Sequence, residues 1–327
     1  MPQRRGARPA PLAAAMTRTA SMQSYLTIRW LADRDYRADA FSLYAYFRWL
    51  DDTVDERLVD RDQRLTFVAR QRSLLSEAAT GATPAGLSPE EALLVDLFRS
   101  DRASSGCGEI RPETLDGQNG GLLLSLRSML DVMEFDARRR GRQVTQDELD
   151  GYTDELAIAV TEALHHCIGH GQHSPHDESR YVAVAGAHVA HMLRDLVEDL
   201  DAGYVNVPSE LLADGSVSLE DLHAPALRAW VHDRVELARS CFDTGRRYLA
   251  RTENARCRLA GHEYIARFEW VLDAVERDGY RLRPSYPERG TLRGGLTIAA
   301  DGARSALVAA RPGSRPAERA ADRKVGR

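Results

Sequence analysis

Apolar residues recur at helical spacing through most of the chain, from about residue 21 to residue 287. The i, i+3, i+4 pattern dominates, whereas the strict alternation that is typical of strands is scarce. Residues 181–200, YVAVAGAHVAHMLRDLVEDL, are apolar nearly all round until Arg194, as in a helix that packs against other helices or lines an apolar cavity. No repeat of fixed period accompanies the pattern. It therefore predicts an all-α fold with one helical domain over residues 21–287.

Local signals mark where helices begin and end. Ser88 precedes a proline and two glutamates, which favours a helix that begins at Pro89. Thr145 and Glu148 form a second capping-box pattern at the start of a long helix. A later helix is predicted to end near Gly279, because glycine is the usual residue just after a helix.

The two ends of the chain differ from its body in composition. Residues 1–20 and 288–327 are rich in Arg, Ala, Gly and Pro, which predicts a disordered N-terminal arm and a disordered C-terminal tail. The short Ala-rich stretch near the start is too weak for a signal peptide, and no run approaches the ~18 apolar residues of a membrane span. We expect a cytoplasmic protein with at most peripheral membrane contact. Whether Met1 or Met16 is the true start stays open.

Composition narrows the function classes. The chain has 327 residues, of which 43% are hydrophobic, and its formal net charge of −5 does not favour nucleic acid as a partner. Its four cysteines are scattered, which favours a reducing compartment and argues against a disulfide framework or a thiolate zinc site. The histidine-rich segment 165–176 matches no standard zinc spacing, so we interpret it as a solvated helix end and loop.

Two clusters of acidic residues stand at the ends of apolar segments. Asp51 and Asp55 are four residues apart in YFRWLDDTVDE, and Asp195 and Asp199 repeat this spacing in RDLVEDLD. Each pair lies on one helical face, where two like charges destabilise a helix by roughly 0.2–0.5 kcal/mol. A solvated acidic face would explain either cluster alone. The alternative is a divalent cation that offsets the repulsion, and Mg²⁺ prefers such carboxylate ligands.

Each cluster also has an arginine at its N-terminal edge, Arg48 in the first and Arg194 in the second. An apolar wall, a carboxylate pair and an arginine, present twice, describe a deep apolar pocket with a metal–diphosphate site at its mouth. An allylic prenyl diphosphate requires this arrangement, because Mg²⁺ makes the diphosphate a leaving group and an apolar wall shelters the carbocation. We therefore predict Mg²⁺ as the cofactor and an allylic prenyl diphosphate as the substrate.

The segments SLYAYFRWLDDTVDE and HMLRDLVEDLDAGYVNVP resemble the two aspartate-rich motifs of the squalene/phytoene synthase family. Ser21-Met-Gln-Ser24-Tyr25 resembles the N-terminal Ser-Phe segment of that family. The stretches MLDVMEFDARRR, LDGYTDELA and FEWVLDAVERDGY are similar to its later landmarks in order and spacing. The resemblance covers most of the body and implies a single-domain isoprenoid-synthase fold, with helices around a deep apolar cavity.

The resemblance also implies roles for individual residues. Arg48, Arg194 and Ser21 would contact diphosphate oxygens, for which a guanidinium fork is well suited. The magnesium ligands would be the motif aspartates, namely Asp51, Asp55, Asp195 and Asp199.

Members of the family join two prenyl diphosphates head to head, and this chain departs from the pattern that serves the second diphosphate. The departures remove cationic and phenolic groups and add bulk, acid or imidazole; they are Gln23, Asp154, Ile158, Thr161, His188, His191, Tyr204, Asn206 and Glu269. Because the aspartates remain, we predict an enzyme that ionises one prenyl diphosphate and passes the prenyl group to another acceptor. The family has divergent relatives that prenylate aromatic rings such as carbazoles, and we predict an aromatic acceptor in secondary metabolism.

An aromatic acceptor needs an apolar slot and a base for the ring proton, although the released pyrophosphate can also take that proton. His191 is the preferred base, because it lies one turn before Asp195 on the same predicted face and titrates near neutral pH. Asp154 is the rival base. The acceptor pocket is predicted to be lined by His188, Tyr204 and Asn206.

Three alternatives stay open. The first is a head-to-head synthase that makes squalene, phytoene or presqualene diphosphate, and the second is a terpene cyclase that uses one diphosphate. The third is a non-enzymatic homologue such as an assembly factor, against which the four intact aspartates argue. The sequence does not decide the prenyl chain length, the acceptor, the regiochemistry or the oligomeric state.

Overall fold

The structure, a computed structural model of the chain, describes residues 10–105, 120–213, 215, 217–219, 221–222 and 224–286. In these ranges every regular element is a helix and no strand is formed, so the predicted all-α fold is confirmed. The elements are α1 (Ala10–Ala20), α2 (Met22–Leu31), α3 (Arg37–Asp52), the π-helical turn η1 (Thr53–Arg57), α4 (Arg61–Thr80), α5 (Pro89–Ser105), α6 (Gly120–Arg139), α7 (Gln146–Cys167), α8 (Ser179–Ala202), α9 (Ser209–Ala213), α10 (Pro225–Arg251) and α11 (Ala255–Arg277).

The predicted helix ends are confirmed where they were marked by capping signals. Thr145 and Glu148 bond reciprocally in a capping box at the start of α7. Ser88 does the same with Glu91 before α5, at 2.9 and 3.1 Å. Helix α11 ends two residues before Gly279, which adopts a φ of 65°, a backbone conformation that a side chain disfavours.

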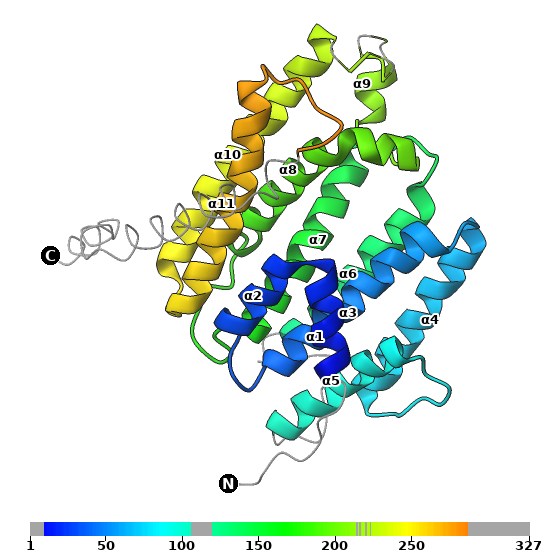
Figure 1. Cartoon of the computed structure of the whole chain (residues 1–327), viewed down its shortest axis with the longest axis vertical. Helices are drawn as coiled ribbons and strands as arrows, with labels where there is room; N and C mark the ends of the chain where they lie inside the picture. Colours follow the sequence, from blue (N-terminus) through cyan, green and yellow to red (C-terminus); the bar gives the residue numbers. More distant parts are fainter. Residues whose placement is uncertain are drawn as a thin grey trace, which may run out of the picture.

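The apolar core has two parts, which α7 joins by packing against both α6 and α8 (Figure 1). One part lies among α1, α3, α4, α5 and α6 and is centred on large buried side chains such as Tyr46 and Phe98. The other lies among α8, α10 and α11 around Phe242. A cavity lies at the edge of the first part, lined mainly by its residues and closed on the other side by α8 and α11.

Helix α8 is held close to α10 by two glycines. A Cβ on Gly186 would lie 2.6 Å from the Cβ of Cys241, and a Cβ on Gly245 would lie 2.5 Å from the Cβ of Ala183. Neither position has space for a side chain, so the two backbones approach directly. This contact positions the site, because the second acidic cluster lies in the C-terminal part of α8, after its apolar part.

Two sequence interpretations need correction. Residues 10–20, assigned to a disordered arm, form helix α1, in which Ala13 and Thr17 are fully buried and which packs on α3. An alanine-rich run is a strong helix former, and its small side chains allow close packing. Of the histidines assigned to a solvated helix end and loop, His173 and His176 are exposed as predicted, but His166 is buried and His165 bonds the Tyr248 hydroxyl at 2.9 Å.

The predicted tail, residues 288–327, lies outside the described residues, as do residues 1–9 of the predicted arm. Among the helices that the structure describes, none combines the length and the apolar character needed to cross a membrane.

Candidate active site

Helix α3 ends on a widened turn that carries part of the first acidic cluster. Asp51 lies in the last turn of α3, whereas Asp55 lies in η1, where the Leu58 N–H donates to the Thr53 carbonyl, five residues back, at 3.1 Å. Such π-helical turns are frequent at functional sites. The Tyr204 hydroxyl donates to the Asp55 carboxylate at 2.7 Å. The turn therefore re-aims Asp55 relative to a regular helix, and a tyrosine from a distant segment holds it.

The second acidic cluster lies at the C-terminal end of α8. Asp195 and Asp199 are one turn apart there, where the negative end of the helix dipole makes carboxylates unfavourable. The helix ends at Gly203, whose φ of 90° reverses the chain. After this reversal Tyr204 reaches the first cluster, and the Asn206 side chain donates to the Asp199 carboxylate at 2.6 Å. The segment after α8 thus connects the two clusters.

A buried acid–base pair from α6 lies between the clusters and was not assigned a role from the sequence. Asp136 is 5% exposed and accepts hydrogen bonds from the Arg139 guanidinium at 2.6 Å and the Tyr152 hydroxyl at 3.1 Å. Arg139 also donates to the side-chain oxygen of Asn206 at 2.6 Å. Its guanidinium lies 4.7 Å from the Tyr152 ring and 4.8 Å from that of Tyr204. Arg139 therefore contacts four residues that position the two acidic clusters: Asp136, Asn206, Tyr152 and Tyr204.

The carboxylates of the two clusters are incompletely neutralised. Burial raises the pKa of Asp51 to about 7, and the charges of Asp55 and Asp136 add to this effect. Burial also raises the pKa of Asp199 to about 7, with Asp195 and Asp136 as negative neighbours. Asp136 acts on both clusters, so all of these carboxylates share one region. Negative charge is thus concentrated where the described protein supplies too few cations to balance it.

Asp195 is the exception, because it already has cationic and hydrogen-bonding partners. Burial alone would raise its pKa, but hydrogen bonds from Arg194 and His191 outweigh burial and hold the pKa below its ordinary value. The Arg194 guanidinium forms a two-pronged pair with the Asp195 carboxylate. In the first cluster, by contrast, Arg48 divides its guanidinium between Asp51 at 3.0 Å and Asp52 at 2.5 Å. Both predicted diphosphate-binding arginines therefore stand at the acidic clusters.

The carboxylates of the two clusters suit Mg²⁺ only together with other ligands. No group of three or more His, Cys, Asp or Glu side chains in the described parts of the chain is arranged closely enough to hold a metal ion alone. Mg²⁺ needs only one or two carboxylates when water and substrate phosphate complete its octahedral shell. Asp51, Asp55 and Asp199 offer hard oxygen ligands whose mutual repulsion a cation would relieve. The residues therefore fit Mg²⁺ that is bound together with a diphosphate.

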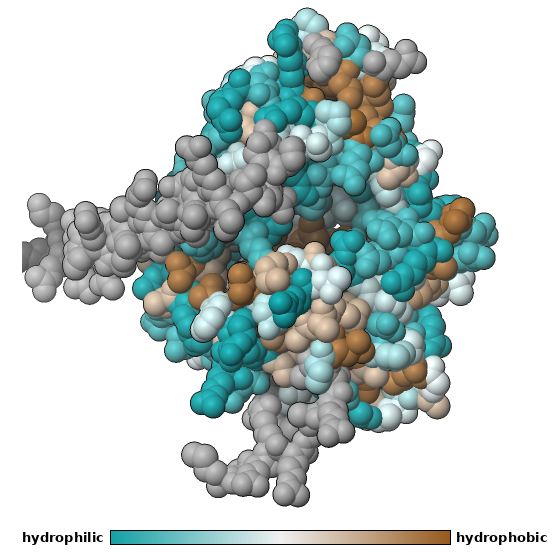
Figure 2. Space-filling view, viewed as in Figure 1, coloured by the Kyte–Doolittle hydropathy of each residue, from teal (hydrophilic) through white to brown (hydrophobic). Residues whose placement is uncertain are grey.

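The main cavity has a volume of about 490 Å³ and lies between α2, α3, α6, α7, α8 and α11. Asp51, Asp136 and Arg48 line it, so it opens onto the first acidic cluster. On the face shown in Figure 2, the surface is hollowed near its centre, with apolar residues visible inside a hydrophilic rim. Most other lining side chains are apolar, among them Leu43, Phe47, Met129, Met133, Leu156 and Leu164.

His188 and His191 both line the main cavity, on the α8 face that leads to Asp195. The His191 side chain is 48% exposed, and its Nε2 is 2.7 Å from the Asp195 carboxylate. His188 is 7% exposed, and neither of its ring nitrogens has a hydrogen-bond partner in the described protein. Its ring meets that of Tyr152 edge-on, with 4.8 Å between centroids. An imidazole without partners at a cavity wall is available to a ligand.

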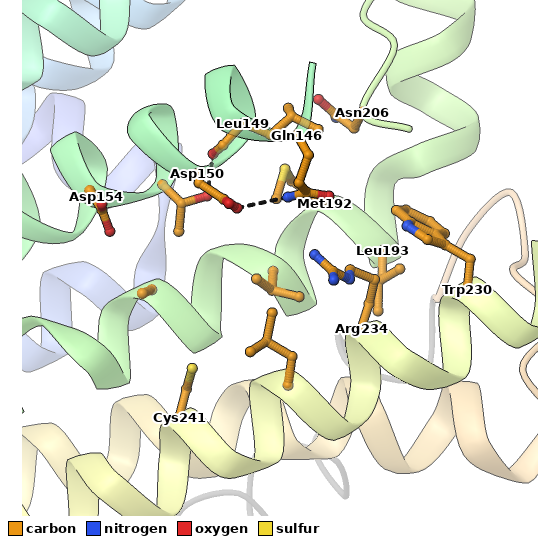
Figure 3. Close-up of a pocket in the computed structure, with 14 residues that line it drawn as sticks. Gln146, Leu149, Asp150, Asp154, Met192, Leu193, Asn206, Trp230, Arg234 and Cys241 are labelled. Carbon is orange, nitrogen blue, oxygen red and sulfur yellow. Dashed lines mark hydrogen bonds between the residues drawn. The ribbon is translucent and has the colours of Figure 1, made fainter. Parts of the chain in front are cut away.

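Asp154 lies elsewhere. It lines a separate side pocket between α7, α8 and α10, with Asp150 one turn before it and Arg234 across the pocket (Figure 3). Tyr152 points into the main cavity, and Asp154, two residues later, points away from it, as helical geometry requires. The structure therefore does not bring Asp154 together with His191, and the interpretation of Asp154 as a rival base loses its geometric basis.

Three further predicted site residues take other places. Ser21 caps α2, where its side chain accepts from the Ser24 N–H at 3.1 Å, and it is Ser24 that lines the main cavity. Tyr204 and Asn206, predicted to line the acceptor pocket, do not line the main cavity. Their side chains bond the motif carboxylates instead, as described above. Their position depends on the chain reversal after α8, which the sequence pattern did not reveal.

Comparison with known proteins identifies the family. A family model described as squalene/phytoene synthase matches residues 17–293. The chain belongs to the squalene/phytoene synthase family. Members of this family are transferases that act on prenyl diphosphates, and the predicted family resemblance is confirmed. No match was found among curated protein sequences.

Solved structures agree at the level of the fold. Squalene synthase HpnC from Alicyclobacillus acidocaldarius is 22% identical, with a TM-score of 0.61, over 84% of this chain and 95% of that chain. A dehydrosqualene synthase in complex with ligand is 16% identical, with a TM-score of 0.66, over 91% of this chain and 96% of that chain. The all-helical architecture is therefore the isoprenoid-synthase fold of the squalene/phytoene synthases.

Proposed function

We propose that this squalene/phytoene synthase family member is a Mg²⁺-dependent prenyltransferase that ionises one allylic prenyl diphosphate. We further propose that it passes the prenyl group to an acceptor without a diphosphate, and that this acceptor is aromatic. The observation that carries the first part is the position of the under-neutralised carboxylates beside an apolar cavity of about 490 Å³. The carboxylates, through Mg²⁺, suit the diphosphate end of a prenyl diphosphate, and the apolar cavity suits its prenyl chain.

Some residues of the site would neutralise the charge of the diphosphate, and others would exclude water from the prenyl chain. Bound Mg²⁺ would neutralise the diphosphate and make it a leaving group. Arg48 and Arg194 exchange their carboxylate partners for diphosphate oxygens, since a guanidinium fork suits both. Apolar side chains of α3, α6 and α7 surround the prenyl chain and keep water from the allylic cation.

Support for a non-diphosphate acceptor comes from those departures from the family pattern that line the main cavity. Gln23 lines the cavity where the family resemblance implies a basic residue. His188 presents two ring nitrogens without partners, which suit an acceptor that carries an N–H or O–H group beside an aromatic ring. Glu269 gives no support, because it pairs with Arg246 of α10 and does not line the cavity.

His191 would serve as the base that takes the ring proton. Burial, partly offset by the hydrogen bond with Asp195, lowers the pKa of His191, which favours the neutral ring. A neutral ring donates from Nε2 to the Asp195 carboxylate, which leaves Nδ1 as the basic nitrogen. The carboxylate thereby sets the tautomer and the orientation, as in other carboxylate–histidine pairs.

One observation favours the alternative, a head-to-head synthase. Arg267 of α11 lines the main cavity and has no ion pair with a carboxylate in the described chain, and its Nε lacks a hydrogen-bond partner. Burial lowers its pKa, and the charge of Arg194 contributes, so the two guanidinium groups are near each other. A cation without an anionic partner in a cavity wall suits a second anion. Arg267 is therefore the residue through which a second prenyl diphosphate would bind.

The number of bound diphosphates separates the two functions. Titration calorimetry with a non-reactive farnesyl thiolodiphosphate and Mg²⁺ is expected to give one molecule per chain in the wild type and in Arg267→Gln. Two molecules per chain in the wild type, falling to one in Arg267→Gln, would contradict the proposal and establish the head-to-head alternative. Asp51→Asn and an EDTA titration are the controls, and both are expected to abolish tight binding, because the metal bridges carboxylate and diphosphate.

A further inference from the structure

Helix α2 carries a stripe of exposed apolar side chains. Met22, Leu26 and Trp30 are 49%, 46% and 68% exposed, and no residue of α2 is fully buried. Their spacing of four residues places all three on one helical face. Single exposed apolar residues are ordinary, but a contiguous stripe with a tryptophan at its end marks an interaction surface. Figure 2 shows apolar residues gathered over α1 and α2, next to the hollow.

The sequence up to the end of α2 is basic, although the chain as a whole is acidic. Residues 1–32 contain five arginines and no acidic residue, whereas the whole chain has a formal net charge of −5. Within this region the Arg29 guanidinium lies 5.3 Å from the Trp30 ring, and that of Arg18 lies 6.0 Å from the Tyr25 ring. Arginine beside exposed tryptophan combines attraction to anions with an apolar anchor.

The same helix forms a wall of the main cavity. Gln23, Ser24, Thr27 and Ile28, on another face of α2, line that cavity. A partner that covers the exposed stripe would therefore lie one helix diameter from the space proposed for the prenyl chain. A lipid surface at this position would lie next to the cavity, and prenyl chains and their transfer products partition into lipid rather than into water.

We propose that the exposed face of α2 docks the protein on the surface of an anionic lipid bilayer, beside the main cavity. Met22, Leu26 and Trp30 enter the boundary between headgroups and acyl chains, and Arg18 and Arg29 face the anionic headgroups. Docking itself rests only on this surface; its use for loading prenyl diphosphate rests on the proposed function. A second copy of the chain fits less well, because a symmetric contact would bring two such arginine-rich regions together.

Vesicle co-sedimentation of the full chain, without substrate, tests the docking directly. The wild type is expected to sediment with vesicles of phosphatidylcholine and phosphatidylglycerol and much less with phosphatidylcholine alone. The triple variant Met22→Ser, Leu26→Ser, Trp30→Ser is expected to lose about tenfold or more of its affinity for the anionic vesicles. Leu237→Ser, which removes an exposed apolar side chain from α10, is the matched control and is expected to bind as the wild type does.

Arg29→Glu separates charge from apolar contact, and it is expected to weaken binding to anionic vesicles with little effect on neutral ones. Wild-type binding to neither vesicle, or equal binding by wild type and triple variant, would overturn the proposal. A concentration-dependent dimer that the triple variant abolishes, seen by sedimentation velocity, would show a protein contact instead. Circular dichroism confirms that the variants are folded. Because no turnover is measured, failure here leaves the proposed catalytic function untouched.

Discussion

Asp51→Asn is expected to slow turnover of an allylic prenyl diphosphate at least about 10²-fold, because it removes a carboxylate that would hold Mg²⁺ against the diphosphate. The substitution keeps the size and shape of the side chain, so the loss reports charge and not packing. Asp195→Asn is expected to cause a loss of similar size. The measurement is pyrophosphate release under saturating Mg²⁺. Full activity in both variants, or in the wild type with EDTA, would contradict the metal site.

Stability distinguishes the two variants and provides the control. Because burial and nearby charge raise the pKa of Asp51 to about 7, the stability that Asp51 contributes is present below about pH 4 and is lost as the pH rises through about 7. Metal-free Asp51→Asn should therefore melt a few degrees above the wild type at pH 8, and this gain should shrink toward pH 5. Asp195→Asn should melt below the wild type at both pH values, because Arg194 and His191 lose a charged partner.

His191→Ala is expected to slow prenyl transfer by about 10²-fold while ionisation of the diphosphate continues, since loss of a general base affects only the later proton removal. The two steps are separable by comparing formation of prenylated product with formation of prenyl alcohol from the water-quenched cation. The expected signature is a shift of the product ratio toward the alcohol. His191→Asn serves as a partial replacement, because an amide can still donate to Asp195 but cannot act as a base.

Two other outcomes would change the assignment of His191. Equal loss of ionisation and transfer would place it in the metal–diphosphate site, where its contact with Asp195 already brings it close. No loss of either would leave it as a structural support for Asp195, and the released pyrophosphate would then be the base. Asp154 is not the next candidate, because it lines the side pocket and not the main cavity.

Much of the fold could be predicted from the sequence because local physical signals determine it. Capping boxes at Ser88 and Thr145 and the glycine after α11 each specify a helix end without reference to distant residues. The acidic clusters were also predictable, since i, i+4 like charges at the end of an apolar segment are unfavourable without a partner. What the sequence did not reveal depends on contacts between distant segments.

The position of Asp154 could have been predicted. By helical spacing, Asp150 and Asp154 share one face and Tyr152 lies on the opposite face. Therefore either Tyr152 or the two aspartates could face the main cavity, but not both. Their alignment with a family motif obscured this periodicity. By contrast, the role of Tyr204 requires the reversal after α8, and the π-helical turn at Asp55 has no simple sequence signature. These features arise from packing between α6, η1 and the end of α8.

The buried pairing of Asp136 could have been predicted from the sequence. It lies on the same helical face as the apolar Val132 and Met133, four and three residues earlier, and is followed three residues later by Arg139, the spacing of a helical ion pair. A charge in that setting must be buried with a partner or reach a functional site. The structure shows both, since Asp136 pairs with Arg139 and lines the main cavity.

Product analysis with one prenyl diphosphate tests the central claim most directly. The enzyme, Mg²⁺ and farnesyl or geranylgeranyl diphosphate are incubated with and without carbazole-type and other aromatic acceptors, and the products are identified by mass spectrometry. The account predicts a prenylated aromatic product that requires the acceptor, and no presqualene- or prephytoene-type product from the diphosphate alone. Robust head-to-head dimerisation of either diphosphate, with no acceptor product, would contradict it.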